Sequence, residues 1–154
     1  MMAADFGCGA GGWTIPLAEM LEDGLVIAID VQEAPLSALM GRARLQGLSN
    51  IRKINADVEG RIRGLADLSC DFVLMTDLLF QVEQREAVFQ EARRVLKKEG
   101  KILVVEWNVD SPLGPRQGRI SQEEIKQIAE KVGFQLETEF PAGDYHFALI
   151  FVKK

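Results

Sequence analysis

The stretch Asp5-Phe6-Gly7-Cys8-Gly9-Ala10-Gly11-Gly12 decides the fold of this chain. It begins at the end of the apolar run Met2 to Phe6 and leads directly into Gly12 to Leu21, a segment with helical spacing. Glycine permits tight turns and a close approach of the backbone to a ligand, and a helix start presents free N–H groups. The stretch therefore predicts a strand, a turn and a helix, with a ligand at the turn, although glycines alone could also serve a tight connection without a ligand.

The rest of the chain repeats this alternation of short apolar runs and helical segments. The further expected helices are Ala34 to Gln46, Gln84 to Leu96 and Ser121 to Val132. The further expected strands are Leu25 to Ile29, Ile51 to Ile54, Phe72 to Thr76, Ile102 to Glu106, Phe134 to Glu139 and Tyr145 to Val152. Apolar strands joined by helices predict an α/β fold, with a mostly parallel, doubly wound sheet covered on both faces.

The ends of the helices and the last two strands carry signals of their own. Ser121 with Glu124 forms a capping box, and we expect helices to stop at Gly133 and Gly100. The link from Pro141 to Asp144 is too short for a crossover, so it predicts an antiparallel hairpin.

Composition limits the class of protein. The chain has 154 residues and a formal net charge of -5, which predicts one domain, residues 1-154, without a general attraction to nucleic acid. Two cysteines, Cys8 and Cys70, allow one bridge at most, and the amino terminus does not resemble a signal peptide, so we expect a reducing, cytoplasmic setting. No apolar run approaches the roughly 18 residues that cross a bilayer.

An acid lies at the exit of each of two further strands. Asp30 closes the second strand and could accept hydrogen bonds from both hydroxyls of a ribose, although Asp is also a good helix cap. Asp57 follows the third strand, where its carboxylate could accept from an adenine amine, although it could equally be a turn residue. Together with the glycine turn, these acids predict a nucleoside site at one edge of the sheet.

These motifs resemble those of class I S-adenosylmethionine-dependent methyltransferases, and most closely the quinone-biosynthesis branch. Asp5 to Gly11 is similar to their first motif, Asp30 to their ribose acid, Ala56-Asp57-Val58 to their adenine contact and Asp71 to Asp77 to their fourth-strand motif. The stretch from Arg94 to Glu106 is similar to their helix-turn-strand, with Lys98 and Glu99 where Pro-Gly is usual. The resemblance implies a Rossmann-like seven-stranded sheet of order 3-2-1-4-5-7-6, with strand 7 antiparallel.

The resemblance also implies a cofactor and its contacts. S-adenosylmethionine would be converted to S-adenosylhomocysteine, and the methyl group would pass to oxygen, nitrogen or carbon of a small-molecule acceptor. The implied cofactor residues are Asp5, Gly7, Cys8, Gly9, Gly11, Asp30, Val31, Ala56, Asp57, Val58, Asp77 and Leu78. The candidate substrate residues, at the strand exits and loops of the same edge, are Phe80, Gln81, Trp107, Arg116 and Tyr145.

Two side chains are candidates for catalysis. His146 opens the last strand, where it could act as a general base or be an ordinary hydrogen-bonded histidine. Asp77 ends the fourth-strand motif and would face the transferring methyl group. Asp77, Glu106 and Asn108 could alternatively hold magnesium, but Trp107 interrupts the adjacent acid-asparagine pair that such sites prefer, so we expect no metal.

Other functions fit the sequence less well. Gly7, Gly9 and Gly12 also match a dinucleotide fingerprint, but the chain has no room for a dehydrogenase substrate domain. Only Met1 to Ala4 precede Asp5, so lid helices ahead of the first strand are expected to be absent, and a second subunit or a lid-supplying partner could complete the pocket. The alternatives are a non-catalytic cofactor-binding module, or an RNA methyltransferase that uses the basic residues Arg42, Arg44, Arg52, Lys53, Arg61 and Arg63.

Overall fold

A computed structural model describes residues 1–154, which form one seven-stranded sheet in the order β3-β2-β1-β4-β5-β7-β6. β7 pairs antiparallel with β5 and β6, and the other pairs are parallel. The predicted topology is therefore confirmed. The strands are β1 Met2–Phe6, β2 Leu25–Asp30, β3 Ile51–Asn55, β4 Cys70–Thr76, β5 Leu96–Trp107, β6 Phe134–Ala142 and β7 His146–Lys153; the helices are α1 Thr14–Met20, α2 Glu33–Leu45, α3 Arg85–Val95 and α4 Gln122–Val132, with a 3₁₀ turn η1 at Leu79–Gln81.

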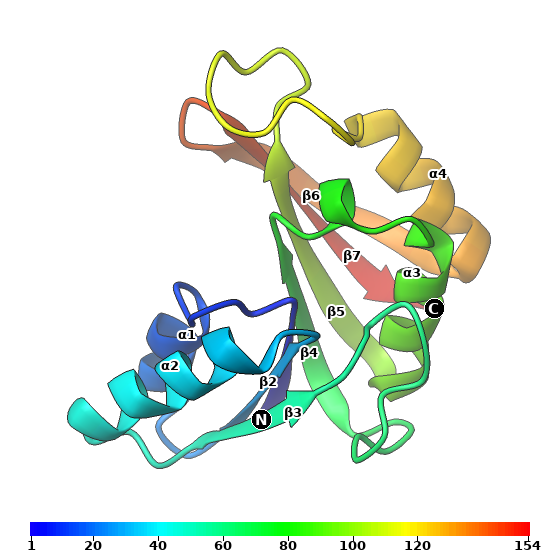
Figure 1. Ribbon diagram of the computed structural model, residues 1–154. Coiled ribbons are helices and arrows are strands. Elements are labelled where there is room, and N and C mark those ends of the chain that lie inside the picture. The colour runs from blue at the N-terminus through cyan, green and yellow to red at the C-terminus, as the bar shows by residue number, and fades with distance from the viewer.

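Helices lie on both faces of the sheet (Figure 1). Successive residues of a strand point to opposite faces. In β2, Val26 and Ala28 pack in a cluster with residues of α1 and α2, whereas Ile27 and Ile29 join the larger cluster that includes α3 and α4. In that cluster the fully buried Phe89 ring lies 6.3 Å from the rings of both Phe134 and Phe151, edge to face. Burying one such ring stabilises the fold by about 2 kcal/mol.

The ends of two helices show what local sequence signals decide. The Ser121 side chain accepts from the Glu124 N–H and Gly133 takes the left-handed conformation after α4, as predicted. The prediction for Gly100 is wrong, because α3 ends at Val95 and Gly100 lies within β5.

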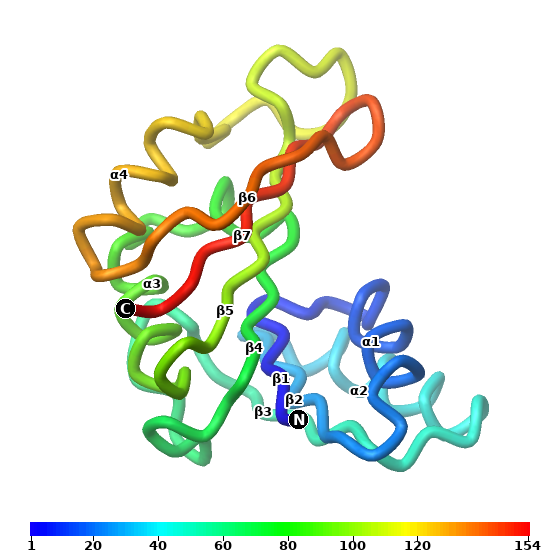
Figure 2. Tube along the Cα trace, turned by 180° about the vertical axis from the view of Figure 1, so that it is seen from behind, coloured from blue at the N-terminus to red at the C-terminus, as the bar shows by residue number.

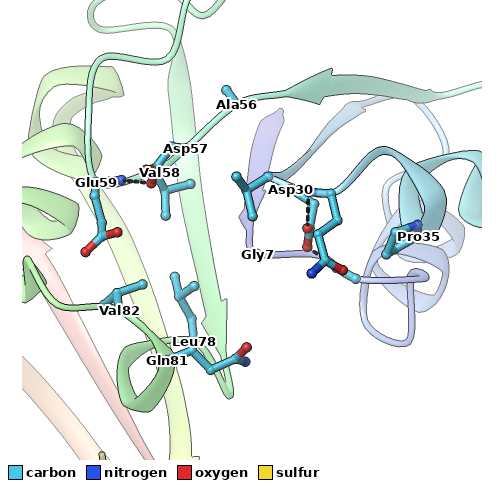
Figure 3. A pocket seen from close by; sticks show the side chains of 13 residues that line it. Gly7, Asp30, Pro35, Ala56, Asp57, Val58, Glu59, Leu78, Gln81 and Val82 are labelled. Carbon is cyan, nitrogen blue, oxygen red and sulfur yellow. Dashed lines mark hydrogen bonds between the residues drawn. The ribbon is translucent and has the colours of Figure 1, made fainter.

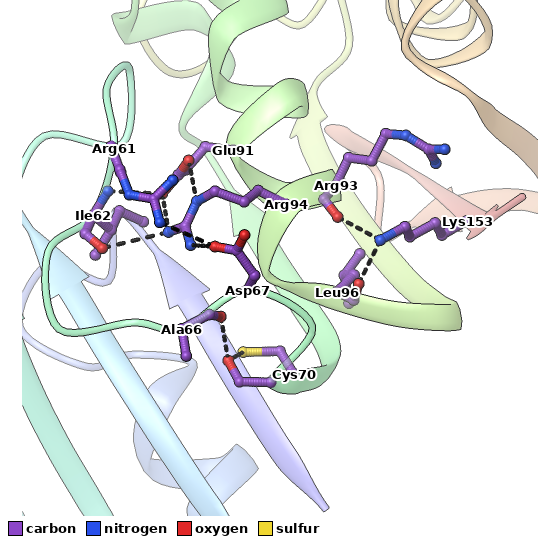
Figure 4. Close-up of polar contacts among 11 residues, drawn as sticks. Arg61, Ile62, Ala66, Asp67, Cys70, Glu91, Arg93, Arg94, Leu96 and Lys153 are labelled. Carbon is purple, nitrogen blue, oxygen red and sulfur yellow. Dashed lines mark hydrogen bonds and ion pairs between the residues drawn. The ribbon is translucent and has the colours of Figure 1, made fainter.

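A lysine from the far end of the chain replaces the expected glycine stop (Figure 4). Lys153 Nζ donates to the carbonyl oxygens of Arg93 (2.7 Å), in the last turn of α3, and of Leu96 (2.6 Å), the C-cap residue that follows it. These carbonyls would otherwise lack partners. The helix therefore ends through a tertiary contact that no local pattern indicates.

The direction of the strands brings five exits to one edge. The parallel strands β1 to β5 all end there, and the antiparallel β7 begins there, as the trace in Figure 2 shows. Residues that follow β1, β2, β3 and β4 are thus brought together with the first residue of β7. No helix of the chain combines the length and the apolar character that crossing a membrane requires.

Candidate functional site

A cavity of about 410 Å³ lies at this edge, among the exits of β1, β2, β3 and β4 (Figure 3). Such a volume is within the usual range for a small-molecule site. Nine of the residues that the sequence analysis singled out line it: Gly7, Gly9, Asp30, Val31, Ala56, Asp57, Val58, Leu78 and Gln81. Four others were missed, namely Gln32, Pro35, Glu59 and Val82.

The glycine turn forms one wall of the cavity. The N–H groups of Gly7 and Cys8 both donate to the Ile29 carbonyl, which fixes the turn on β2. Gly7 has φ 74°, and a Cβ there would lie 2.7 Å from a methyl carbon of Leu78. Gly9 has φ 56°, and a Cβ there would meet nothing within 4 Å, because this residue faces the open cavity. Both conformations favour glycine.

Asp30 holds two segments of the wall in place. Its Oδ2 accepts from the Gly9 N–H at 2.9 Å and its Oδ1 accepts from the Gln32 N–H at 2.9 Å. Each carboxylate oxygen can accept more than one hydrogen bond, so acceptor capacity remains for a ligand.

The opposite wall depends on two acids after β3. Asp57 Oδ1 accepts from the Glu59 N–H at 2.8 Å, which leaves Oδ2 without a partner in the chain. Glu59 Oε1 in turn accepts from the backbone N–H groups of Glu83 (2.8 Å) and Gln84 (2.6 Å), just ahead of α3. Glu59 therefore ties the β3 exit to the β4 exit. Its position two residues after Asp57 was the only signal in the sequence.

Four predicted cofactor residues do not line the cavity: Asp77 is one, and the other three lie in or next to the glycine turn. Asp5 is fully buried, and its Oδ2 accepts from the Thr14 hydroxyl at 2.6 Å. Cys8 packs among the apolar residues under α1 and α2. A Cβ at Gly11 (φ 91°) would lie 2.2 Å from Leu39, so this glycine allows α2 to pack against the turn. These residues support the turn from behind.

Asp5 retains an unusual carboxyl group. Its Oδ1 is buried and has no hydrogen-bond partner. Burial raises its pKa to about 6, although the Thr14 hydrogen bond opposes the shift and the charge of Asp30 adds to it.

The exit of β4 and the start of β7 bring the two candidate catalytic residues together. His146 Nε2 lies 3.1 Å from Asp77 Oδ1, an ion-pair distance, but the angle is not that of a hydrogen bond. The His146 ring also packs on Trp107, with centroids 4.1 Å apart. Burial raises the pKa of Asp77, and the nearby His146 opposes that shift.

Glu106 holds the segment that follows Asp77. It is almost completely buried, and its Oε2 accepts from the N–H groups of Leu78 and Leu79, each at 2.8 Å. Burial raises its pKa to about 7, the two backbone hydrogen bonds lower it, and the charge of Asp77 raises it further. This acid, considered above as a magnesium ligand, anchors the start of η1.

The remaining predicted substrate residues lie outside the cavity at the strand exits. Phe80 is half-buried in η1, and Tyr145 is exposed at the hairpin, where its carbonyl accepts from the Asn108 N–H. Arg116 is exposed and makes no hydrogen bond or ion pair within the chain. Trp107 lies between His146 and Gly114, where a Cβ would be 2.6 Å from the indole. It therefore offers little free ring surface to a substrate.

A second, smaller cavity of about 280 Å³ lies beside the catalytic candidates. It is lined by Asn108, Gln122, Glu139, Phe140, Pro141, His146 and Phe147. The two cavities share no lining residue.

The basic residues considered for RNA binding are mostly engaged within the chain. Arg61 pairs with Asp67 at 3.1 Å, in a network that also contains Arg94 and Glu91 (Figure 4). Lys53 pairs with Glu33. Arg52 and Arg42 donate to the backbone carbonyls of Gly64 and Ala10. The described contacts favour a solvated, internally paired surface over a nucleic-acid site.

Comparisons with known proteins agree with this geometry. A family model described as "Methyltransferase domain" matches residues 3–100. Demethylmenaquinone methyltransferases of Bacillus cereus and Bacillus mycoides are 32% and 31% identical over 121 residues, which cover 77% of this chain and 49% of each relative. The chain thus spans about half the length of these curated relatives.

Solved structures extend the likeness to the whole chain. A SAM-dependent methyltransferase from Aquifex aeolicus superposes with a TM-score of 0.92 and 27% identity, covering 100% of this chain and 82% of that one. The PH0226 protein from Pyrococcus horikoshii OT3 has the same fold, with a TM-score of 0.84 and 21% identity over 99% of this chain and 82% of its own. The family match, the sheet order and the cavity agree, and the chain belongs to the methyltransferase domain family.

Proposed function

We propose that the chain binds S-adenosylmethionine in the larger cavity and transfers its methyl group to a small-molecule acceptor, leaving S-adenosylhomocysteine. The observation that carries the proposal is the meeting of Gly9, Asp30 and Asp57 in one cavity from three successive strand exits. The family match and the likeness to a SAM-dependent methyltransferase from Aquifex aeolicus support it.

The residues of the cavity fit such a cofactor. Gly9 presents bare backbone to the space where the methionine portion would lie. Asp30 has free acceptor capacity for the ribose hydroxyls, and the unpartnered Oδ2 of Asp57 could accept from the adenine amine. Val58, Leu78 and Val82 supply apolar walls for the adenine ring.

The chemistry requires positioning more than a nucleophile. The sulfonium supplies an activated methyl group and a neutral thioether leaving group. The part of this chain is to hold donor and acceptor in line and to exclude water. Asp30 fixes the turn around Gly9, and Glu106 fixes Leu78 at the wall nearest the acceptor side.

For the acceptor, we propose a hydroxylated ring of the quinol type. The curated relatives are named for demethylmenaquinone, which supports this class. We also propose that a second copy or a partner covers the rim of the site, because Val31 at the cavity and Trp13 next to the glycine turn are 66% and 48% exposed. Cys8 and Cys70 are both free thiols, which supports a reducing cytoplasmic setting.

Two measurements test the proposal. Calorimetric titration with S-adenosylhomocysteine should give saturable one-site binding. Incubation with isotopically labelled S-adenosylmethionine and a panel of hydroxylated rings should give labelled product by mass spectrometry. Saturable binding without transfer to any acceptor would contradict the catalytic part of the proposal, and absence of binding would contradict all of it. Light scattering with and without cofactor tests for a second copy.

A further inference from the structure

The contact between Asp77 and His146 is the least satisfied polar contact at this edge of the sheet. Asp77 Oδ1 and His146 Nε2 are both buried and both lack a hydrogen bond, although they lie only 3.1 Å apart. A buried polar atom without a partner costs about 1–3 kcal/mol. Such an arrangement in a folded protein calls for an explanation, and a functional one is that a ligand completes it.

The backbone holds Asp77 in this arrangement. Its φ is 50°, in the left-handed region that is unfavourable for a residue other than glycine. Its N–H donates to the Val105 carbonyl at 2.9 Å, and its carbonyl accepts from the Gln81 side chain at 2.6 Å. Strain of this kind gathers at functional sites, where the surroundings enforce it.

His146 is equally well positioned. In the antiparallel pair of β5 and β7 it lies opposite Trp107, which packs against its ring, while Gly114 lies against the indole. Its Nε2 lies 3.1 Å from Asp77 Oδ1, whereas Nδ1 makes no hydrogen bond in the chain and is not among the fully buried atoms. One ring nitrogen thus contacts a carboxylate, and the other remains available.

The pair is connected to both cavities through one residue each. Leu78, the neighbour of Asp77, lines the larger cavity that we assign to the cofactor. His146 lines the smaller cavity, together with the aromatic rings of Phe140 and Phe147. An acceptor with a flat apolar body in the smaller cavity would therefore have the imidazole beside its hydroxyl, and its reacting atom would extend past the pair to meet the methyl donor in line.

We propose that Asp77 and His146 form a proton-accepting pair for the methyl acceptor, and that the smaller cavity admits a phenol or enol whose hydroxyl gives up its proton to His146. This inference rests on the proposed function and specifies the acceptor side of the same site. An acid acceptor such as a carboxylate would need no base, so the pair favours a hydroxyl that is neutral at pH 7.

The hydroxyl O–H bond breaks, its proton goes to Nδ1 of His146, and its electron pair stays on the ring system. That electron density forms the new bond to the methyl carbon, at oxygen or at the adjacent ring carbon, while the S–CH₃ pair returns to sulfur. For attack through carbon, the ring C–H proton passes afterwards to water, which restores aromaticity. Asp77 stabilises the imidazolium that results.

Other charges bear on the pair. Glu106 from β5 is buried beneath it and is coupled to Asp77 by charge. Glu139 of β6 lines the same small cavity as His146 but is paired with Lys126 at 2.5 Å. Asp77 is thus the carboxylate that faces His146. The charge of Glu106 influences how readily Asp77 ionises.

The first test is the tautomer of the histidine, which nuclear magnetic resonance can read without assignment because His146 is the only histidine. In ¹⁵N-labelled protein at pH 8.5, the proposal expects the proton on Nε2, facing Asp77, and a bare Nδ1. Asp77→Asn should shift the population toward the Nδ1–H form. A wild-type chain with the proton mainly on Nδ1 would overturn the proposal. This readout needs neither cofactor nor turnover.

The second test uses acceptors of graded acidity, 1-naphthol and 2,4-dinitro-1-naphthol, with S-adenosylmethionine. For 1-naphthol at pH 7, His146→Gln should lower kcat about 100-fold. For the dinitro compound, which is already ionised, the loss should be less than threefold. Asp77→Asn should show the same contrast with a smaller loss. The control Asp144→Asn removes an exposed charge two residues away and should change neither rate.

The outcomes separate this inference from the proposed function. Calorimetry with S-adenosylhomocysteine is run on every variant, and its failure in the wild type would count against the cofactor site itself. Normal cofactor binding with no transfer to either naphthol would refute the acceptor class. Equal losses for both naphthols in His146→Gln would indicate a structural role for the histidine and would overturn the proton-accepting pair.

Discussion

Asp30 and Asp77 are two carboxylates at the same edge of one sheet, yet their surroundings differ. Asp30 is the last residue of β2, and Asp77 directly follows β4; both strands are parallel. Both oxygens of Asp30 accept backbone N–H groups. Asp77 has a buried oxygen without a hydrogen bond, a left-handed backbone, and a pKa that burial raises.

The difference separates two tasks within the site. The carboxylate of Asp30 is used to build and fix a cradle, so its half of the site, from β1 to β3, is preorganised for binding. The carboxylate of Asp77 lies beside His146 without forming a hydrogen bond to it. This half of the site therefore contains two buried polar atoms without hydrogen-bond partners. We therefore expect changes in the first half to affect cofactor affinity, and changes in the second half to affect transfer and pH dependence.

The largest expected effect concerns Glu106, the acid beneath Asp77. Because burial raises its folded pKa from 4.5 to about 7, the folded state binds the proton more tightly than the unfolded state between those values. The free energy of unfolding should therefore fall as the pH rises from about 4.5 to 7, by about 3 kcal/mol. Urea unfolding of Glu106→Gln should show a clearly flatter profile.

The matched control for this slope is Glu130→Gln, an exposed acid on α4. It should retain the wild-type profile. Asp5, whose pKa burial raises to about 6, contributes in the same direction, so some slope should persist in Glu106→Gln. An unchanged slope in Glu106→Gln would show that the buried acid is not the source.

The next largest effect tests the difference between the two carboxylates directly, through the affinity for S-adenosylhomocysteine. Asp30→Ala removes the proposed ribose acceptor and two hydrogen bonds of the cradle, so the Kd for S-adenosylhomocysteine should rise about 100-fold, or about 2.7 kcal/mol. Asp77→Asn should change that Kd less than threefold, because Asp77 does not line the cavity. Asp23→Ala, an exposed acid elsewhere, serves as the calorimetric control. Similar losses for Asp30→Ala and Asp77→Asn would remove the distinction.

Two glycines of one turn separate cofactor binding from stability of the fold. Gly11→Ala places a Cβ 2.2 Å from Leu39 and should lower stability by about 2 kcal/mol. Gly9→Ala places a Cβ in open space within the cavity, so it should cost about 1 kcal/mol of backbone strain and mainly weaken cofactor binding. Thermal unfolding and calorimetry on both variants would show whether the effects separate. Gly47→Ala, at φ 73° with nothing near its Cβ, measures the strain alone.

The smallest effect compares two left-handed residues at opposite edges of the sheet. Glu99, at φ 65°, precedes the regular part of β5, and glycine there should stabilise the fold by about 1 kcal/mol. Asp77→Gly should relieve similar strain at φ 50° while transfer to 1-naphthol falls. A melting temperature and a transfer assay for each variant check this pair. If Asp77→Gly kept full transfer, strain at this position would have no functional meaning.

The fold was predictable because its signals are local. Apolar periodicity gave the seven strands and four helices, and the short link between Pro141 and Asp144 gave the antiparallel end of the sheet. The end of α3 was not predictable, since Lys153, distant in sequence, caps it in place of the glycine expected at Gly100. Local patterns contain no information on such a contact.

The site was predictable to the level of strand exits but not of side-chain direction. Gly9 and Asp30 line the cavity as expected, whereas Gly11 turns toward Leu39 because α2 packs there. Glu59 was missed because its role depends on backbone N–H groups ahead of α3. The contact of Asp77 with His146 depends on the register of β7 against β5, which the sequence does not specify.

The most direct test of the account is a crystal structure of the chain soaked with S-adenosylhomocysteine. The account predicts that the adenosyl group occupies the cavity between Gly9 and Asp57, with both ribose hydroxyls on the carboxylate of Asp30. An empty cavity at saturating ligand, or a ligand bound elsewhere with Asp30 untouched, would contradict it.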